Sequence, residues 1–255
     1  MNLLMVDLVD RFYALIWPLL RISAFMAFSS IFSVRAVNLR VRILISFCLT
    51  LFVAMQIDIP KLDPATVDGL KEIFNQLFIG FSMAMVMQLA TAALVIAGQA
   101  LSGSMGLTMA NLIDPTLGNV PVLSQFFTLL GTLVFLAIGG HVIVFGIVLE
   151  SFQQFPIGQS LMNQAFMGKM INWSAMMFLA SLLIALPVLI TLLFVNVGLG
   201  FVTRAAPSLN IFSVGFPAMV LSGFVILWLA LPNVIGRINW LWVQTFNQLR
   251  SLLLT

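Results

Sequence analysis

The chain has 255 residues, of which 62% are apolar and only 7% are charged. A water-soluble domain carries roughly 25% charged residues, so this composition excludes a soluble fold and indicates a surface that meets lipid or apolar partners. The net charge of +3 is small and the bases are scattered, which gives no sign of nucleic-acid binding.

Apolar stretches follow one another along the whole chain. A helix that spans a membrane needs about 20 predominantly apolar residues. The stretches lie at residues 12–34, 41–57, 73–101, 122–149, 173–202 and 211–232, with a weaker one at 238–254. This pattern predicts an all-α membrane protein.

Two polar segments separate these stretches and are predicted to be aqueous loops. Asp58–Glu72 contains two prolines and six charged residues, and Glu150–Asn172 contains glutamines, a proline and a glycine near its start. Cys48 lies in an apolar run, and we expect it to be a buried small hydrophobe.

The predicted helices are not simple rods. The stretch 73–101, as a helix at about 1.5 Å per residue, is about 43 Å long, which exceeds a hydrocarbon core of about 30 Å. Pro18, Pro187 and Pro217 lie inside apolar stretches, where each removes a backbone donor and bends a helix. We therefore expect kinked helices packed in an assembly.

Two polar side chains lie within apolar stretches. Arg21 is costly there unless it is paired or faces a polar cavity; the alternative is that it snorkels from a helix kinked near Pro18. His141 is predicted to make a structural hydrogen bond between helices, with a proton relay as the alternative.

Motifs that carry enzymatic chemistry are missing from the sequence. One histidine and one cysteine, 93 residues apart, do not form a metal site, and no phosphate-binding or dinucleotide-binding glycine motif occurs. We therefore expect neither an enzyme nor a bound cofactor.

The segment Ser102–Val120 reads SGSMGLTMANLIDPTLGNV and differs from the rest of the chain. It contains no Lys or Arg, and it is too polar and too rich in glycine to span a membrane. This composition is typical of a re-entrant element that lines or blocks a cavity; a surface loop with a turn at Asp114–Pro115 is the alternative. Its methionines, among the 15 of the chain, suit either a deformable seal around a pore or ordinary membrane packing.

Four strings resemble the R subunit of the flagellar type III protein export gate (the FliR family) and its T-type relatives in virulence secretion. They occur in the family's order, and the fourth is the most specific: FSVRAVNLRVRILIS at 32–46, GLTMANLIDP at 106–115 with NVPVLSQFF at 119–127, GGHVIVFGIVLESFQQFPIG at 139–158, and GFVTRAAPSLNIFSVGFP at 200–217.

This resemblance implies an architecture of kinked helical hairpins within a helical export-gate assembly. Residues 1–180 would form a P-like region and residues 181–255 a Q-like C-terminal two-helix hairpin, with its tip at Arg204–Asn210. The implied partners are the P and Q subunits, other membrane subunits of the export apparatus, unfolded flagellar proteins and membrane lipid. The implied location is the bacterial inner membrane in the flagellar basal body, with parts at the periplasmic face.

The resemblance also implies a plug loop at about Ser104–Val120 that keeps the channel closed. The family often has phenylalanines where Met109 and Leu112 stand here. The expected plug residues are Met105, Leu107, Met109, Leu112 and Ile113, and the expected hinge residues are Gly103, Gly106 and Gly118. Arg204 is expected to contact a partner subunit or acidic lipid, with a simple positive anchor as the alternative.

Two other functions are compatible with the residues alone. A polytopic transporter of small molecules or ions predicts charges at the membrane midplane and inverted repeats, of which the sequence offers only Arg21 and His141. A membrane scaffold that does not touch the pore is the second alternative.

Overall fold

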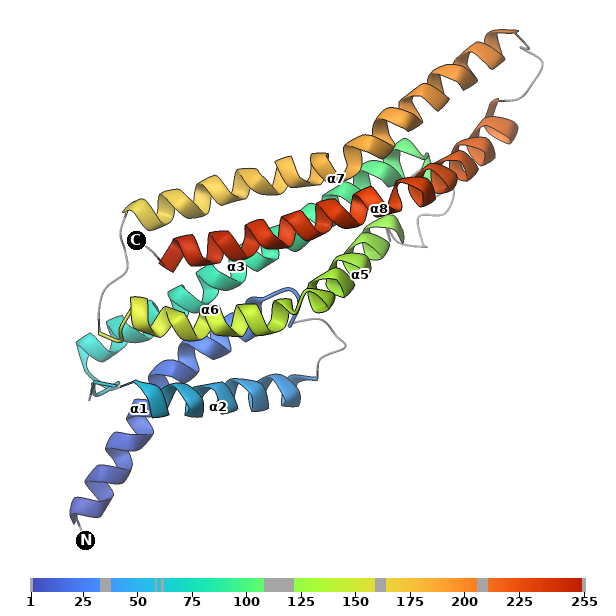
Figure 1. The fold of residues 1–255 in the computed structure, drawn as a ribbon. Coiled ribbons are helices and arrows are strands. Elements are labelled where there is room, and N and C mark those ends of the chain that lie inside the picture. The colour runs from blue at the N-terminus through green and yellow to red at the C-terminus, as the bar shows by residue number, and fades with distance from the viewer. Residues whose placement is uncertain are drawn as a thin grey trace. The chain divides into compact units, whose positions relative to one another are not determined.

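The apolar stretches form helices, because a helix satisfies its backbone polar groups within one segment. The computed structural model describes residues 2–32, 38–57, 59–60, 62–107, 122–158, 164–205 and 211–253. Within these ranges every longer regular element is an α-helix, and the prediction of an all-α membrane protein is confirmed. The helices, shown in Figure 1, are α1 (Asn2–Phe28), α2 (Leu39–Gln56), α3 (Val67–Ser104), α5 (Val122–Ala137), α6 (Gly140–Gln154), α7 (Gln164–Ala205) and α8 (Ile211–Leu253).

Four of the described helices are long and apolar enough to cross a membrane, and the number is five when the bent pair α5–α6 counts as one span. α3 buries 61% of its most apolar stretch within the chain, whereas α2 buries 17% and α8 buries 22%. α3 is therefore the most buried of these four helices, and α2 and α8 keep apolar faces for lipid or other chains. Cys48 lies exposed on α2, so the expectation that it is buried is wrong.

The chain folds into two compact units, each built from separate segments. The first unit comprises Met1–Leu89, Gly139–Ser174 and Gln244–Thr255. Within it, α1 packs against α2 (Figure 1). Its core consists of large buried side chains, among them Trp17, Ile22, Phe25, Met26, Met83, Met87 and Phe152.

The second unit comprises Ala90–Ile138 and Ala175–Val243. Its core includes Leu94, Leu101, Phe127, Phe135, Leu192 and Trp242. Both units take segments from either side of residue 180. The predicted division into 1–180 and 181–255, which concerns subunit-like parts and not compact packing, stays a prediction.

Small residues bring α3 and α5 close together in the second unit. A Cβ atom on Gly98 would lie 2.5 Å from the Cα atom of Ser124, and one on Gly131 would lie 2.2 Å from Cδ1 of Leu94. The Ser124 hydroxyl donates a 2.9 Å hydrogen bond to the carbonyl of Val95. Close approach through small residues and hydroxyl bonds is how helices associate in a membrane.

Three predicted boundaries are wrong. The predicted aqueous loop Asp58–Glu72 ends earlier, because α3 begins at Val67 and Glu72 is buried. The predicted loop Glu150–Asn172 is also shorter, because α6 continues to Gln154 and α7 begins at Gln164. Glu72 is accommodated in α3 because Gln76, on the same helix, donates to its carboxylate, and Arg21 of α1 donates to Gln76.

Two further stretches differ from the expected pattern. The stretch 122–149 is not one helix: Gly139 adopts a φ of +70°, a left-handed conformation that side chains rarely adopt, and it separates α5 from α6. The stretches 211–232 and 238–254 are one helix, α8, which contains both Pro217 and Pro232. Pro18 and Pro187 lie within α1 and α7.

Candidate functional site

Arg21 is a charged side chain in the core of the first unit, with no exposed surface. Its Nε atom donates to Oε1 of Gln76 at 2.7 Å, and Nη1 donates to the carbonyl and hydroxyl oxygens of Ser151 at 2.8 and 3.1 Å. Nη2 donates to the carbonyl of Phe155 at 2.9 Å, and Cζ lies 4.0 Å from the ring centroid of Phe152. The rigid, planar guanidinium thus binds on several sides at once, and the snorkelling alternative is wrong.

Two features offset the buried charge of Arg21. The carbonyls of Ser151 and Phe155 belong to the C-terminal end of α6, where the helix dipole is negative. Gln76 also donates from Nε2 to Oε1 of the buried carboxylate of Glu72. Gln76 therefore links the positive guanidinium to a negative carboxylate without direct contact between the two.

A glycine explains how α1 comes close enough to α3 for this network. A Cβ atom on Gly80 would lie 2.2 Å from the carbonyl oxygen of Arg21 and 3.0 Å from the Cβ atom of Ala24. The two backbones therefore touch at Gly80, one helical turn after Gln76. Because side chains of an α-helix point towards its N-terminus, Gln76 can reach back to the guanidinium.

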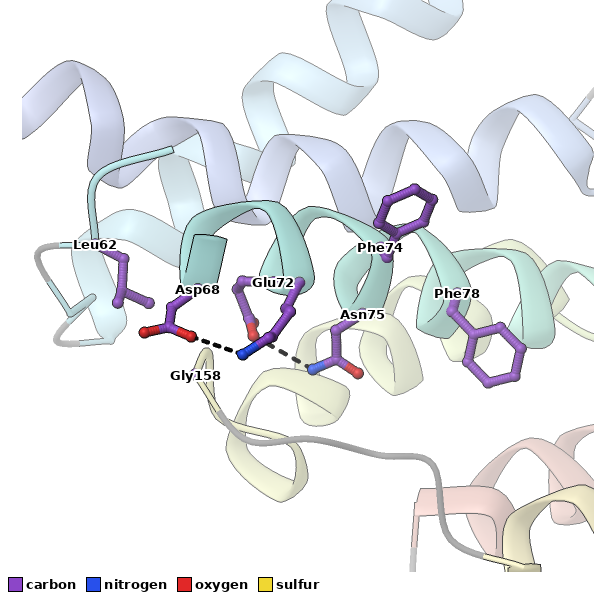
Figure 2. A pocket seen from close by; sticks show the side chains of 8 residues that line it. Leu62, Asp68, Glu72, Phe74, Asn75, Phe78 and Gly158 are labelled. Carbon is purple, nitrogen blue, oxygen red and sulfur yellow. Dashed lines mark hydrogen bonds and ion pairs between the residues drawn. The ribbon is translucent and has the colours of Figure 1, made fainter. Parts of the chain in front are cut away.

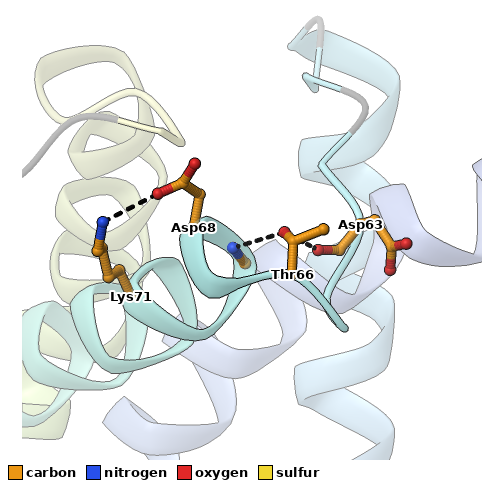
Figure 3. Close-up of polar contacts among 5 residues, drawn as sticks. Asp63, Thr66, Asp68 and Lys71 are labelled. Carbon is orange, nitrogen blue, oxygen red and sulfur yellow. Dashed lines mark hydrogen bonds and ion pairs between the residues drawn. The ribbon is translucent and has the colours of Figure 1, made fainter.

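The beginning of α3 is fixed by a hydrogen-bonded turn (Figure 3). The backbone N–H of Ala65 donates to Oδ1 of Asp63 at 2.9 Å, and the Thr66 hydroxyl donates to the Asp63 carbonyl at 2.8 Å. The N–H of Gly69 donates to Oγ1 of Thr66 at 3.1 Å, which makes Thr66 the N-cap of the helix. A Cβ atom on Gly69 would lie 2.2 Å from the Asp63 carbonyl oxygen. This turn sets the register of α3, and with it the positions of Glu72 and Gln76.

A cavity of about 760 Å³ lies beside this end of α3 in the first unit (Figure 2). Asp68 and Lys71 form an exposed ion pair at 3.0 Å on its wall, and Glu72 accepts a hydrogen bond from Asn75. The lining residues are Leu62, Asp68, Lys71, Glu72, Phe74, Asn75, Phe78 and Gly158. They offer carboxylates, the Lys71 ammonium group, an amide and aromatic rings, and none of them is a Ser, Cys or His. Across the described part of the chain, no group of three or more His, Cys, Asp or Glu residues could hold a metal.

The other end of α3 leads into the unusual segment Ser102–Val120. The N–H of Met105 donates to the Leu101 carbonyl at 2.9 Å, and the N–H of Gly106 donates to the Gly103 carbonyl at 3.1 Å. Gly106 has a φ of +75°. A glycine in this left-handed conformation is a common way for a helix to end. Because the resemblance predicts a plug in this segment, we call residues 102–107 the plug root, a name that refers to this prediction.

The plug root rests on α8 within the second unit. Met105 has no exposed surface, and a Cβ atom on Gly223 would lie 2.5 Å from its Cε, 2.7 Å from its Cγ and 3.0 Å from its Sδ. A Cβ atom on Gly106 would lie 3.5 Å from Cδ2 of Phe216. The missing side chain at Gly223 therefore provides the space that Met105 occupies.

Comparison with known proteins identifies the family. The profile of the family "Bacterial export proteins, family 1" matches residues 12–245. The chain belongs to this family. It is 34% identical to the flagellar biosynthetic protein FliR of Pectobacterium carotovorum subsp. carotovorum, over 98% of this chain and 95% of the relative. It is 30% identical to FliR of Escherichia coli (strain K12), over 93% and 91%, and 34% identical to FliR of Aquifex aeolicus (strain VF5), over 76% of each.

The resemblance to the FliR family is thereby confirmed. This member of the export family is a membrane component of the flagellar type III export apparatus, in the inner membrane. Membership implies association with other subunits of that apparatus.

Several expected site residues of this export-family member lie outside the described residues: Met109, Leu112, Ile113 and Gly118. Of the described ones, Met105 is fully buried, Leu107 is partly exposed and Gly103 is an exposed residue within α3. Gly106 has a left-handed backbone conformation, with a φ of +75°. The plug and hinge roles themselves stay predictions.

The remaining expected residues are also placed. Arg204 is exposed in the last turn of α7, and the rest of the predicted hairpin tip, 206–210, lies outside the described residues. The Nδ1 atom of His141 is buried and has no hydrogen-bond partner among the described residues, so the expected bond between helices is not formed at this nitrogen.

Three residues with clear structural roles escaped the sequence analysis. Glu72 and Gln76 are four residues apart, on one face of a helix, and this spacing could have signalled a polar pair. Glu72 was instead assigned to an aqueous loop. Gly223 lies in an apolar stretch and carries no sequence signal, since its role depends on which side chain faces it.

Proposed function

We propose that this chain forms part of the entrance channel of the flagellar type III export gate, together with P and Q subunits. Unfolded flagellar proteins would pass through the channel, and Ser102–Val120 would be the plug that keeps it closed. The observation that carries this proposal is the segment itself: it has no Lys or Arg, its one charged residue is Asp114, it is rich in glycine and methionine, and it precedes α5 at the end of the long apolar helix α3.

The proposed plug works by excluding water. Met109 and Leu112 are bulky and apolar, and a narrow apolar constriction dewets and so blocks ions. A substrate chain would displace these side chains. Gly106, whose φ is already +75°, provides a backbone position at which the segment turns without steric strain.

The proposed contacts with P and Q subunits and with lipid fit the exposed apolar surface. Phe194 on α7 is 71% exposed and Trp228 on α8 is 72% exposed within this chain. Large apolar side chains at this exposure require lipid or protein cover. Arg204, which is exposed in the last turn of α7, would contact a partner subunit or an acidic headgroup. Parts of the chain would lie at the periplasmic face.

The buried polar network argues against the transporter alternative. Arg21 is the charge that a substrate would need, and its donors are already engaged by Gln76, Ser151 and Phe155. A fully buried and hydrogen-bonded guanidinium holds helices together and is not free to bind a transported molecule.

Deletion of Met105–Ile113 tests the proposed plug. The assembled export complex, reconstituted in vesicles, should then conduct ions, because the apolar constriction is gone. The length-matched double variant Met109→Ser/Leu112→Ser should also leak, and Met109→Leu should stay closed. Unchanged conductance in the deletion variant would rule out the plug.

A crosslinking experiment separates a gate from a scaffold. In a Cys48→Ser background, a cysteine at position 109 should crosslink to a substrate stalled during export. A cysteine at exposed position 55 on α2 serves as the control, since Met55 is 83% exposed on a helix of the other unit. Equal crosslinking at both positions would contradict the gate.

A further inference from the structure

Met105 of the plug root packs tightly against Gly223 of α8 in the second unit. Three atoms of one methionine crowd the space above a single glycine, at 2.5, 2.7 and 3.0 Å from the position of a Cβ atom. Real Cβ atoms essentially never have neighbours under 3.0 Å. Met105 has no exposed surface, so its side chain is enclosed by other atoms of the chain.

We propose that Gly223 is a positioning residue of the export gate: its missing side chain forms the seat that fixes Met105, and with it the root of the plug. This inference rests on the proposed function of Ser102–Val120 as the plug. Met105 stays seated while the gate works, and the moving part of the segment begins at Gly106.

The order of residues along the chain supports this division. Met105 still donates its N–H to Leu101, as a helical residue does, at 2.9 Å. The next residue, Gly106, has left the helix with a φ of +75°. The anchor and the pivot are therefore adjacent, so a small shift of Met105 changes the direction in which the following segment leaves α3.

The seat is selective for a glycine. With alanine at 223, the Cε atom alone could swing aside at little cost, but Cγ lies at 2.7 Å and is close to the backbone. The whole Met105 side chain must then change rotamer within a close-packed core. The ring of Phe216 lies next to Gly106. It therefore restricts movement of the plug root on that side.

The same helix provides a matched control. Gly236 also lies within α8 and within the second unit, and a Cβ atom there would meet no heavy atom within 4 Å. Gly223→Ala and Gly236→Ala make the same chemical change on one helix. Only the first displaces Met105.

Ion conductance of the reconstituted export complex, measured per assembled complex, tests the seat. Gly223→Ala should leak more than the wild type and less than the Met105–Ile113 deletion, and Gly236→Ala should stay closed. Met105→Ala/Gly223→Ala should leak less than Gly223→Ala alone, because the shorter side chain makes room for the added methyl group. A closed Gly223→Ala complex, or a double variant that leaks as much as the single one, overturns the proposal.

Crosslinking provides an answer even if Gly223→Ala does not assemble. In a Cys48→Ser background, Met105→Cys/Gly223→Cys should crosslink in the closed complex, and the crosslinked complex should still export. Failure to crosslink, or a block of export that reductant relieves, overturns the proposal. If the Met105–Ile113 deletion leaks and these variants behave like the wild type, only the seat fails; if the deletion does not leak, the plug itself is wrong.

Discussion

The Nε atom of Arg21 and the Oε1 atom of Gln76 are joined by a 2.7 Å hydrogen bond in the buried core of the first unit. The two residues are 55 positions apart, on α1 and α3. Gln76 in turn donates to the carboxylate of Glu72. The amide of Gln76 therefore forms hydrogen bonds with both a buried base, Arg21, and a buried acid, Glu72.

Replacement of Arg21 by methionine should destabilise the chain strongly. The change leaves Glu72 without its compensating charge and removes the guanidinium donor from the Phe155 carbonyl, whereas the Ser151 carbonyl keeps its bond from the Phe155 N–H. Removing one partner of a buried charged network costs about 3–5 kcal/mol, and we expect a large drop in the thermal denaturation midpoint of the detergent-solubilised protein.

Two further variants show whether charge is the reason. Arg21→Met/Glu72→Gln should recover part of the loss, because no unpaired carboxylate remains. Arg21→Lys should fall between Arg21→Met and the wild type, since an ammonium cannot reproduce the planar fork. A midpoint for Arg21→Met equal to that of the wild type would contradict the network.

Gly80→Ala should separate α1 from α3. The added Cβ atom would lie 2.2 Å from the carbonyl oxygen of Arg21, and a backbone atom cannot move aside alone. Overpacking of this kind costs about 1–3 kcal/mol. Gly146→Ala is the control in the same unit, because its Cβ atom meets nothing within 4 Å, and alanine gains up to about 1 kcal/mol in helix propensity. The denaturation midpoint should fall for the first variant and hold or rise for the second.

Trp242→Phe should weaken the second unit. Trp242 is fully buried, and its Nε1 atom donates a 2.9 Å hydrogen bond to the Gly131 carbonyl. A buried hydrogen bond of this type contributes about 0.5–1.5 kcal/mol, and the smaller ring also leaves a void. Trp228→Phe, on the same helix and 72% exposed, should have little effect. Equal thermal shifts for the two variants would count against the Trp242 bond.

Gly106→Ala should strain the plug root, because an L-residue at a φ of +75° costs about 1–2 kcal/mol. Asparagine visits this backbone region more readily, so Gly106→Asn should be milder. Ion conductance of the assembled complex should therefore rank Gly106→Ala above Gly106→Asn, with the wild type lowest. The reverse order would show that side-chain size at 106, and not the backbone, sets the seal.

Lys169→Met should loosen the C-terminal end of α8. The Lys169 Nζ atom donates to the Ser251 carbonyl at 2.6 Å, and the Gln248 amide donates to the Lys169 carbonyl at 3.3 Å. A cation at a helix C-terminus contributes about 0.3–1 kcal/mol. Amide hydrogen exchange in 246–253 should speed up by a few-fold. Lys71→Met removes an exposed ion pair and should leave this exchange unchanged.

The sequence was sufficient to predict the class of the protein and the unusual character of one segment. The low charge and the apolar stretches of about 20 residues indicated helices in a membrane, because a helix satisfies its backbone polar groups within one segment of that length. Element ends were less predictable. Glu72 is a charged residue of the kind expected in a loop, yet it belongs to α3. Gln76 on the same helix donates to its carboxylate, and Arg21 of α1 in turn donates to Gln76.

By itself, the sequence determined an all-α membrane chain of the export family and a glycine-containing segment without Lys or Arg, whose one charged residue is Asp114, between two apolar stretches. Only the tertiary structure decided how Arg21 is satisfied and why Gly223 carries no side chain. Composition and periodicity describe short stretches of the chain. The roles of Arg21 and Gly223 depend instead on contacts between distant residues: Arg21 and Gln76 are 55 positions apart, and Met105 and Gly223 are 118 positions apart. In a close-packed core, the absence of a side chain at a glycine or the presence of a buried charge restricts which side chains can lie beside it. Those neighbours are determined by the tertiary fold and not by distance along the sequence.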